Sequence, residues 1–149
     1  MKDFALGAFD LNSQLANDCI VLGDFPVCRL LLMNDSQYPW FILVPRVAGA
    51  EELYQLDEEI QQQVLRESSF FAEVLSVLFD AEKMNVAAIG NMVRQLHIHH
   101  VVRYSHDIAW PAPVWGKFPA VPYTEEKRSE VLAKVAEALS GDFPFQMAV

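Results

Sequence analysis

The chain has 149 residues, of which 52% are hydrophobic and 21% charged, and its formal net charge at pH 7 is −9. This length and composition predict one ordinary soluble globular domain that spans residues 1–149 and buries a core of its own. The negative charge argues against non-specific nucleic-acid binding, which needs a basic surface, but it does not exclude a small phosphorylated ligand held by a local group of donors.

The chain carries no apolar run of the kind found in signal peptides, and no stretch approaches the roughly 20 uncharged apolar residues of a membrane span. Cys19 and Cys28 form no Cys-x-x-Cys pair and are too few for a disulfide framework, so we expect two reduced thiols. These features predict a cytoplasmic protein with no membrane partner.

The first part of the chain predicts a short helix followed by a hairpin. Residues 11–18 suit the helix, and the Gly-Asp pair at 23–24 is typical of a turn. Two apolar runs, 27–33 and 40–44, are joined by the polar stretch 34–37, which indicates an antiparallel hairpin.

A long amphipathic helix is expected to begin near Asp57, which suits the N-cap position and precedes two glutamates in the first turn. Apolar residues then recur every three or four positions and form one stripe: Ile60, Val64, Phe71, Leu75 and Leu78. The side expected to face solvent carries Gln61, Gln62, Arg66, Glu67 and Glu73.

The second half predicts two strands, an extended loop and a closing helix. Residues 85–89 suit a short strand, which Gly90-Asn91 interrupts before a strand rich in histidine. Three prolines within 110–119 indicate an extended loop, and Thr124 suits the cap of a final helix that ends near Leu139. Strands in hairpins with segregated helices indicate an α+β domain on an antiparallel sheet.

The most informative pattern lies in the histidine strand, where Gln95, His97 and His99 alternate with apolar residues. Because successive side chains of a strand point to opposite faces, these three polar groups would share one face. Imidazole suits proton transfer, nucleophilic attack and metal binding near neutral pH. His97 is the best candidate for the nucleophile of a phosphoryl or nucleotidyl transfer, because its two neighbours on that face can donate hydrogen bonds to phosphate oxygens.

Residues 95–103 resemble the motif of the histidine triad (HIT) family, in which three histidines alternate with apolar residues. The hairpin of residues 31–46, the helix after Asp57 and the pair Gly90-Asn91 are similar to further parts of this family, and residues 110–116 resemble a bacterial branch of HIT-family hydrolases. The resemblance implies a HIT-like antiparallel β-sheet with a long amphipathic helix and a C-terminal helix.

The same resemblance implies the catalytic residues. His97 occupies the position of the nucleophile that takes the nucleotidyl group, and His99 matches the third histidine, which contacts phosphate. Gln95 stands at the first histidine position, and its amide can donate a hydrogen bond but cannot relay a proton.

Four further residues are implied in nucleotide binding. Asn34 matches a contact to the ribose hydroxyls, and Asn91 matches a glutamine that binds phosphate or the leaving group. Trp40 stands where the family often has histidine, and it either stacks on a base or fills the core. Arg103 either ends the strand in solvent or contacts phosphate.

Other aromatic and imidazole groups are expected to be structural. His100 lies on the opposite face of the strand and should be a hydrogen-bonded, half-buried histidine, whereas His106 should be a loop residue. Trp110 and Trp115 should anchor the proline-rich loop.

Three functions remain open. The first is a nucleotide hydrolase or transferase that cleaves a dinucleoside polyphosphate or nucleoside phosphoramidate at the α-phosphate through a covalent intermediate on His97. The second is a nucleotide-binding sensor or partner module of the same fold with little or no catalysis, which the departures at Gln95 and His100 support. The third is a metal site, since His-x-His is a common ligand pair, but nothing completes such a site at persuasive spacing. We therefore expect no metal and no cofactor, and the family implies a homodimer.

Overall fold

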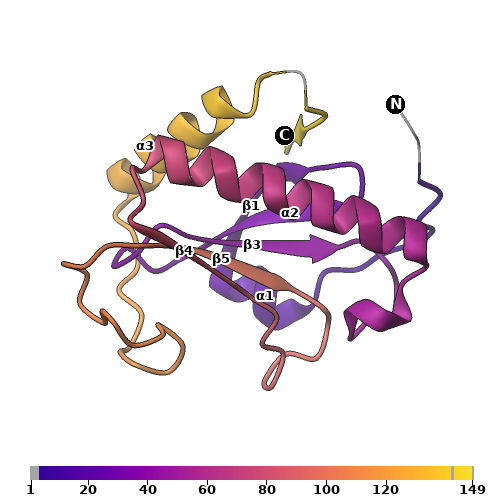
Figure 1. The fold of residues 1–149 in the computed structure, drawn as a ribbon, viewed down its shortest axis with the longest axis horizontal. Helices are drawn as coiled ribbons and strands as arrows, with labels where there is room; N and C mark the ends of the chain where they lie inside the picture. The colour runs from indigo at the N-terminus through magenta and orange to yellow at the C-terminus, as the bar shows by residue number, and fades with distance from the viewer. Residues whose placement is uncertain (1–3, 142, 149) are drawn as a thin grey trace.

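The computed structural model describes residues 4–141 and 143–148 (Figure 1). One antiparallel sheet lies at its centre, with the strand order β4-β5-β3-β2-β1-β6. The strands, in chain order, are β1 Cys19–Asp24, β2 Cys28–Met33, β3 Trp40–Pro45, β4 Lys83–Ala87, β5 Ile98–Arg103 and β6 Gln146–Met147. This sheet with its helices confirms the predicted α+β class.

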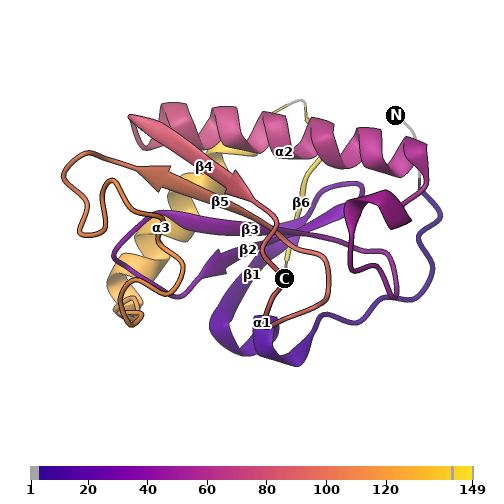
Figure 2. The same ribbon diagram turned by 60° about the horizontal axis from the view of Figure 1, so that its bottom comes forward.

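Helices cover the sheet from both sides (Figures 1 and 2). The long helix α2 (Glu58–Leu78) and the C-terminal helix α3 (Glu125–Ala138) pack on one face, and the short helix α1 (Ser13–Asp18) lies on the other. A 3-10 turn, η1 (Leu53–Gln55), leads into α2. The predicted cap of the last helix is confirmed, because Thr124 Oγ1 accepts a hydrogen bond from the Lys127 N–H.

The central strands are apolar on both faces because both faces are covered. In β2 and β3, Leu30, Leu32, Phe41 and Leu43 pack toward α2 and α3, while Leu31, Ile42 and Val44 pack toward α1 and the loop after β5. A strand buried on both sides reads as a continuous apolar run, which is why residues 27–33 and 40–44 were recognisable as strands.

Glu67 is placed differently from the prediction, which assigned it to the solvent side of α2. Its side chain is fully buried, and the carboxylate accepts hydrogen bonds from the N–H groups of Val27 and Cys28 and from the Gln63 side chain. The reason is tertiary: α2 crosses the turn between β1 and β2, whose backbone donors need an acceptor once they are buried. Burial raises the pKa of the Glu67 carboxyl.

The turn predicted at residues 23–24 is also wrong, because Gly23 and Asp24 are the last residues of β1. The register of β1 on β2 shifts between Val21 and Gly23, which marks a bulge. At Gly23 the terminal strand β6 comes so close that a Cβ would lie 2.2 Å from the Gln146 carbonyl oxygen. Glycine at this position therefore serves close backbone approach within the sheet rather than a turn.

Both cysteines are free thiols, as expected. Cys28 is fully buried and Cys19 half-buried. Burial raises the pKa of Cys19 to about 12, and it also raises the pKa of Cys28. Within the described parts of the chain, none of the helices combines the length and the apolar character that a membrane crossing requires.

Candidate active site

Strand β5 carries the histidines and begins at Ile98, so His97 lies immediately before the strand rather than within it. The alternation nevertheless continues through this junction. Leu96 and Ile98 belong to the core under α2, whereas the His97 and His99 rings lie beside each other with centroids 4.9 Å apart. Both imidazoles are 5% exposed. The structure therefore pairs the two histidines on one face, as the sequence predicted.

The His97 ring is held by the backbone two residues earlier. Its Nδ1 lies 2.7 Å from the Gln95 carbonyl oxygen. Because a carbonyl oxygen only accepts, Nδ1 carries a proton, and in the neutral ring Nε2 is the nitrogen that keeps its lone pair. An imidazole in this tautomer is oriented for nucleophilic attack through Nε2.

The His99 ring has the opposite tautomer. Its Nδ1 accepts a hydrogen bond from the indole N–H of Trp40 at 3.0 Å, which assigns the proton to Nε2. Burial and the neighbouring His97 lower the pKa of His99 to about 3, and a hydrogen bond with the Ile89 backbone opposes this only in part. His99 is therefore a neutral group at neutral pH, fixed by an indole.

The side chain of Gln95 is engaged away from the two imidazoles. Its Oε1 accepts from the Asn12 N–H at 2.8 Å, and its Nε2 donates to the Asp10 carbonyl at 3.0 Å. The amide thus ties the segment before α1 to the start of β5. What Gln95 supplies to His97 is its backbone carbonyl.

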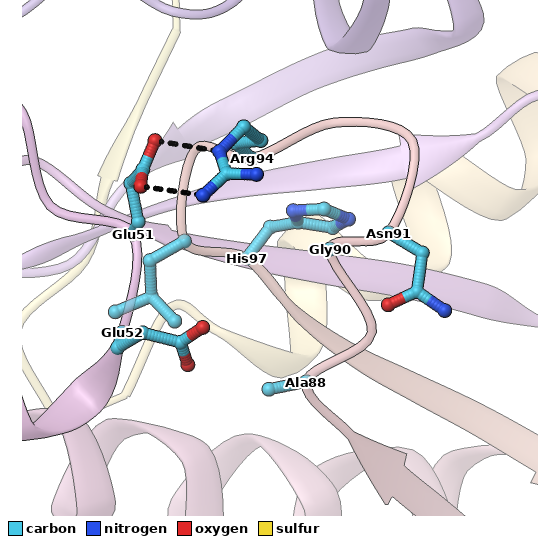
Figure 3. A pocket seen from close by; sticks show the side chains of 8 residues that line it. Glu51, Glu52, Ala88, Gly90, Asn91, Arg94 and His97 are labelled. Carbon is cyan, nitrogen blue, oxygen red and sulfur yellow. Dashed lines mark hydrogen bonds and ion pairs between the residues drawn. The ribbon is translucent and has the colours of Figure 1, made fainter.

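A pocket of about 440 Å³ opens beside His97 (Figure 3). Its walls come from the connection between β3 and α2 and from the connection between β4 and β5, which ends at His97: Glu51, Glu52, Ala88, Gly90, Asn91, Arg94, Leu96 and His97. Asn91, predicted as a binding residue, lines this pocket together with His97. Most of its polar side chains are charged or amide groups, which suits an ionic ligand.

Arg94 lines the same pocket as His97. Its guanidinium Nε lies 3.2 Å from a carboxylate oxygen of Glu51, and the two side chains are 79% and 41% exposed. An ion pair this open to water contributes little to folding stability. The guanidinium is therefore available to exchange its carboxylate partner for a phosphate group.

Glu51 and Glu52 were not predicted as site residues. They reach the pocket because the Leu96 N–H donates to the Ala50 carbonyl at 2.9 Å, which brings the end of the β3 connection against the start of β5. No motif marks such a contact between residues 46 positions apart in sequence. Only a prediction that the β3–α2 connection packs against the β4–β5 connection would have placed Glu51 and Glu52 in the pocket.

Asn34 and Arg103, which were predicted to bind the nucleotide, lie outside the pocket beside His97. The Asn34 side chain accepts from the Tyr123 N–H at 3.0 Å and holds the approach to α3. Arg103 is 1% exposed and forms an ion pair of 2.8 Å with Asp107, so it is not the solvated strand end that was one of its two expected roles. Its guanidinium also donates to the Asn85 side chain and to the Ala112 carbonyl. Neither Asn34 nor Arg103 lines the pocket beside His97.

The tryptophans surround the second histidine. Trp40 is 8% exposed in the core cluster under α1, which confirms the core-packing alternative, and its N–H also positions His99. The Trp115 ring packs 5.3 Å from His99 and 6.3 Å from Trp40, while Trp110 lies under the guanidinium of Arg103. The proline-rich loop is thus anchored by both of its tryptophans, as predicted.

His100 and His106 lie outside the pocket face, as predicted, but His100 is fully buried rather than half-buried. His100 is fully buried, with Nδ1–H donating to the Ile98 carbonyl and Nε2 lying 2.7 Å from Ser68 Oγ. Burial lowers its pKa to about 4. His106 is an exposed loop residue stacked on Tyr104. Among residues 4–141 and 143–148, no three His, Cys, Asp or Glu side chains are grouped so that they could hold a metal ion.

Comparison with known proteins gives the same architecture. Residues 14–106 match the HIT domain family. A histidine triad protein from Marinobacter aquaeolei VT8 is 56% identical, with 89% of this chain and 97% of that chain covered and a TM-score of 0.87. Histidine triad proteins from Bradyrhizobium japonicum (36% identity, 89% and 98% covered) and Sinorhizobium meliloti 1021 (38%, 91% and 100% covered) also superpose with TM-scores of 0.87. Among curated proteins, none matches this sequence.

The chain therefore belongs to the HIT family, a family of proteins that bind nucleotides, usually as hydrolases or transferases, and that often dimerise.

Proposed function

We propose that this protein is a nucleotide hydrolase or nucleotidyl transferase that cleaves its substrate at the nucleoside α-phosphate through a covalent intermediate on His97. The observation that supports this most directly is the Nδ1–H bond from His97 to the Gln95 carbonyl. In the neutral ring this bond leaves Nε2 as the unprotonated nitrogen, and the ring lines a polar pocket of about 440 Å³. Dinucleoside polyphosphates and nucleoside phosphoramidates are the candidate substrates.

In the first step, His97 Nε2 attacks the α-phosphorus in line with the leaving group. The new N–P bond forms as the bond to the leaving group breaks, and positive charge develops on the ring. The Gln95 carbonyl accepts the Nδ1–H throughout, so it stabilises the cationic imidazole of the intermediate. Water then attacks the phosphorus, the N–P electron pair returns to Nε2, and the attacking water loses one proton to the solvent.

Asn91 and Arg94 are the donors best placed to hold phosphate oxygens, since both line the pocket with His97. The Arg94 guanidinium gives up its contact with Glu51 when phosphate enters, and a bidentate contact to phosphate is stronger than the exposed ion pair it replaces. His99, neutral and fixed by Trp40, keeps the face beside the nucleophile uncharged.

The test is intact-mass spectrometry of the protein after brief incubation with dinucleoside polyphosphates and nucleoside phosphoramidates. The reaction is quenched at neutral to basic pH, because phosphoramidates are labile in acid. We expect a mass gain of one nucleotidyl group on the wild type, located on the peptide that contains His97, and none on His97→Gln.

The matched control is His106→Gln, which removes an exposed imidazole that lies outside the pocket and should keep the adduct. Thermal unfolding of both variants checks that each remains folded. Binding of nucleotides with neither adduct nor products after long incubation would replace this proposal with the sensor or partner module.

We also propose a homodimer formed through strand β4 and helix α2. β4 is an edge of the sheet; Val86 within it is 48% exposed, and Leu65 on α2 is 66% exposed. An unpaired edge with neighbouring apolar groups suits pairing with a second copy. Light scattering should give twice the mass of the 16.9 kDa chain, and Leu65→Lys with Val86→Lys should give the monomer mass.

A further inference from the structure

Leaving groups differ in whether they need a proton to depart. When the bond between the α-phosphorus and an anhydride oxygen breaks, the oxygen leaves as a stable phosphate anion. When a P–N bond breaks, the nitrogen must gain a proton, because an amide anion is far too basic to leave. A site that cleaves both therefore needs a residue that gives up a proton beside the nucleophile.

The residue at the first triad position does not supply this proton. Gln95 carries an amide, which donates a hydrogen bond but does not ionise near neutral pH. Moreover, both ends of the amide are occupied by the backbone of Asp10 and Asn12, at 3.0 and 2.8 Å. The Gln95 side chain lines a second pocket, not the pocket that contains His97.

His99 does not supply it either. Its Nδ1 accepts a hydrogen bond from the indole N–H of Trp40, so the ring cannot take up a second proton at Nδ1 without losing this bond. The ring is 5% exposed and held among Trp40, Trp115 and His97. An imidazole enclosed in this way stays neutral, and it does not cycle between its two protonation states during turnover.

The other polar groups that line the pocket are of the wrong kind. Glu51 and Glu52 are carboxylates that accept hydrogen bonds and carry negative charge. Arg94 and Asn91 donate hydrogen bonds without releasing a proton. They can hold a phosphate oxygen that becomes more negative, but they cannot neutralise a departing nitrogen.

We propose that this site is selective for nucleotide substrates whose leaving group departs as an oxyanion, such as a nucleoside polyphosphate, and that it discriminates against substrates with amine leaving groups. The inference rests on the proposed attack by His97. In the favoured reaction, His97 Nε2 bonds to the α-phosphorus, the P–O bond breaks, and the electron pair leaves on the phosphate oxygen with no proton transferred. Water then releases the nucleoside monophosphate and loses one proton to the solvent.

The test uses adenosine 5′-phosphate joined to pairs of leaving groups that share a shape. One member of each pair is a phenol ester and the other is the corresponding anilide, and the phenols span several units of acidity. We expect kcat/KM of the esters to fall steeply as the phenol becomes less acidic. We expect each anilide to react about 10²- to 10⁴-fold more slowly than its ester, the range that general acid catalysis contributes where it is present.

Two variants assign the effect. Gln95→Ala loses both bonds to the N-terminal segment but keeps the backbone carbonyl under His97, and it should retain the ester-to-anilide ratio of the wild type. Asn91→His adds an ionisable ring to the wall of the pocket that contains His97, and it should lower the ratio at least about tenfold relative to the wild type.

The outcomes separate this inference from the function on which it rests. A wild type that cleaves esters and anilides within tenfold of each other, an Asn91→His variant that leaves the ratio unchanged, or a Gln95→Ala variant that lowers it as much as Asn91→His, overturns the selectivity. Absence of both turnover and adduct with every substrate overturns the proposed function, and the selectivity with it.

Discussion

The two faces of strand β5 show how the same side chain is used in opposite ways. On the pocket side, His97 has one nitrogen bonded to a backbone carbonyl, and the other has no hydrogen-bond partner among the residues that the structure describes. On the helix side, His100 has both nitrogens occupied, by the Ile98 carbonyl and by Ser68. The two rings lie three residues apart and both are buried. We therefore expect reactivity to depend on which ring nitrogen is left without a partner, rather than on the residue type or its burial.

His99 lies between these extremes. It shares the face of His97, but the indole of Trp40 occupies its Nδ1 as completely as Ser68 occupies the Nε2 of His100. Low pKa values, about 3 and about 4, follow in both cases from burial of the ring. The comparison predicts one reactive imidazole and two that behave as neutral structural groups.

The largest expected effect is on kcat, when the histidine on each face of β5 is replaced in turn. His97→Gln should lower kcat by at least about 10³-fold, because the nucleophile is lost and only binding remains. His100→Gln retains hydrogen bonding to Ser68 and should stay within tenfold of the wild type. Single-turnover kinetics with a dinucleoside polyphosphate measures both, and equal losses in the two variants would contradict the distinction.

Removal of the indole donor should make His99 less well ordered. Trp40→Phe keeps an aromatic ring in the core but leaves His99 Nδ1 without its partner, so it should cost about 1–3 kcal/mol of stability. Because the freed ring can exchange tautomers, kcat should also fall about tenfold. Urea unfolding and kinetics test this, and Trp115→Phe is the matched control since it removes no hydrogen bond to a histidine.

The pH dependence of the unfolding free energy tests whether the buried His100 ring is neutral in the folded chain. Its pKa is about 4 in the folded chain and near 6.5 when unfolded, so below pH 6.5 the unfolded state binds more protons and stability falls. Between pH 7 and pH 5 this group should account for about 2 kcal/mol of the loss. His100→Gln should reduce the loss by that amount in urea titrations. An unchanged pH profile would show that His100 does not stay neutral.

The smallest effect is expected at the exposed rim of the pocket. Arg94→Ala removes a phosphate donor and should raise KM several-fold with kcat little changed, while the unfolding free energy changes by less than about 0.5 kcal/mol because its ion pair is exposed. Glu51→Ala, which removes the competing carboxylate, should leave KM unchanged or lower it. A fall in stability instead would show that the pair supports the fold.

The predicted and observed sites agree where local pattern decides the geometry. The two-residue alternation placed His97 and His99 together, and the apolar stripe of α2 predicted the burial of Val64, Phe71 and Leu75. These features depend only on the periodicity of strand and helix, so sequence alone can reveal them.

The disagreements involve polar groups whose partners are distant in sequence. Glu67 is buried because it meets the N–H groups of Val27 and Cys28, 40 and 39 residues away. The Gln95 amide binds Asn12 across 83 residues. A buried polar side chain is tolerated only with a partner, and no pattern near Glu67 or Gln95 indicates which backbone groups will meet them.

The two cysteines give this protein a reporter of its own unfolding. Thiol reagents react with the thiolate, and burial keeps Cys28 and Cys19 protonated in the folded chain, with the pKa of Cys19 at about 12. Once the chain opens, both thiols regain their ordinary acidity and become accessible. Alkylation at neutral pH therefore modifies opened molecules far faster than folded ones, so the rate of labelling tracks opening events without any change to the histidine face.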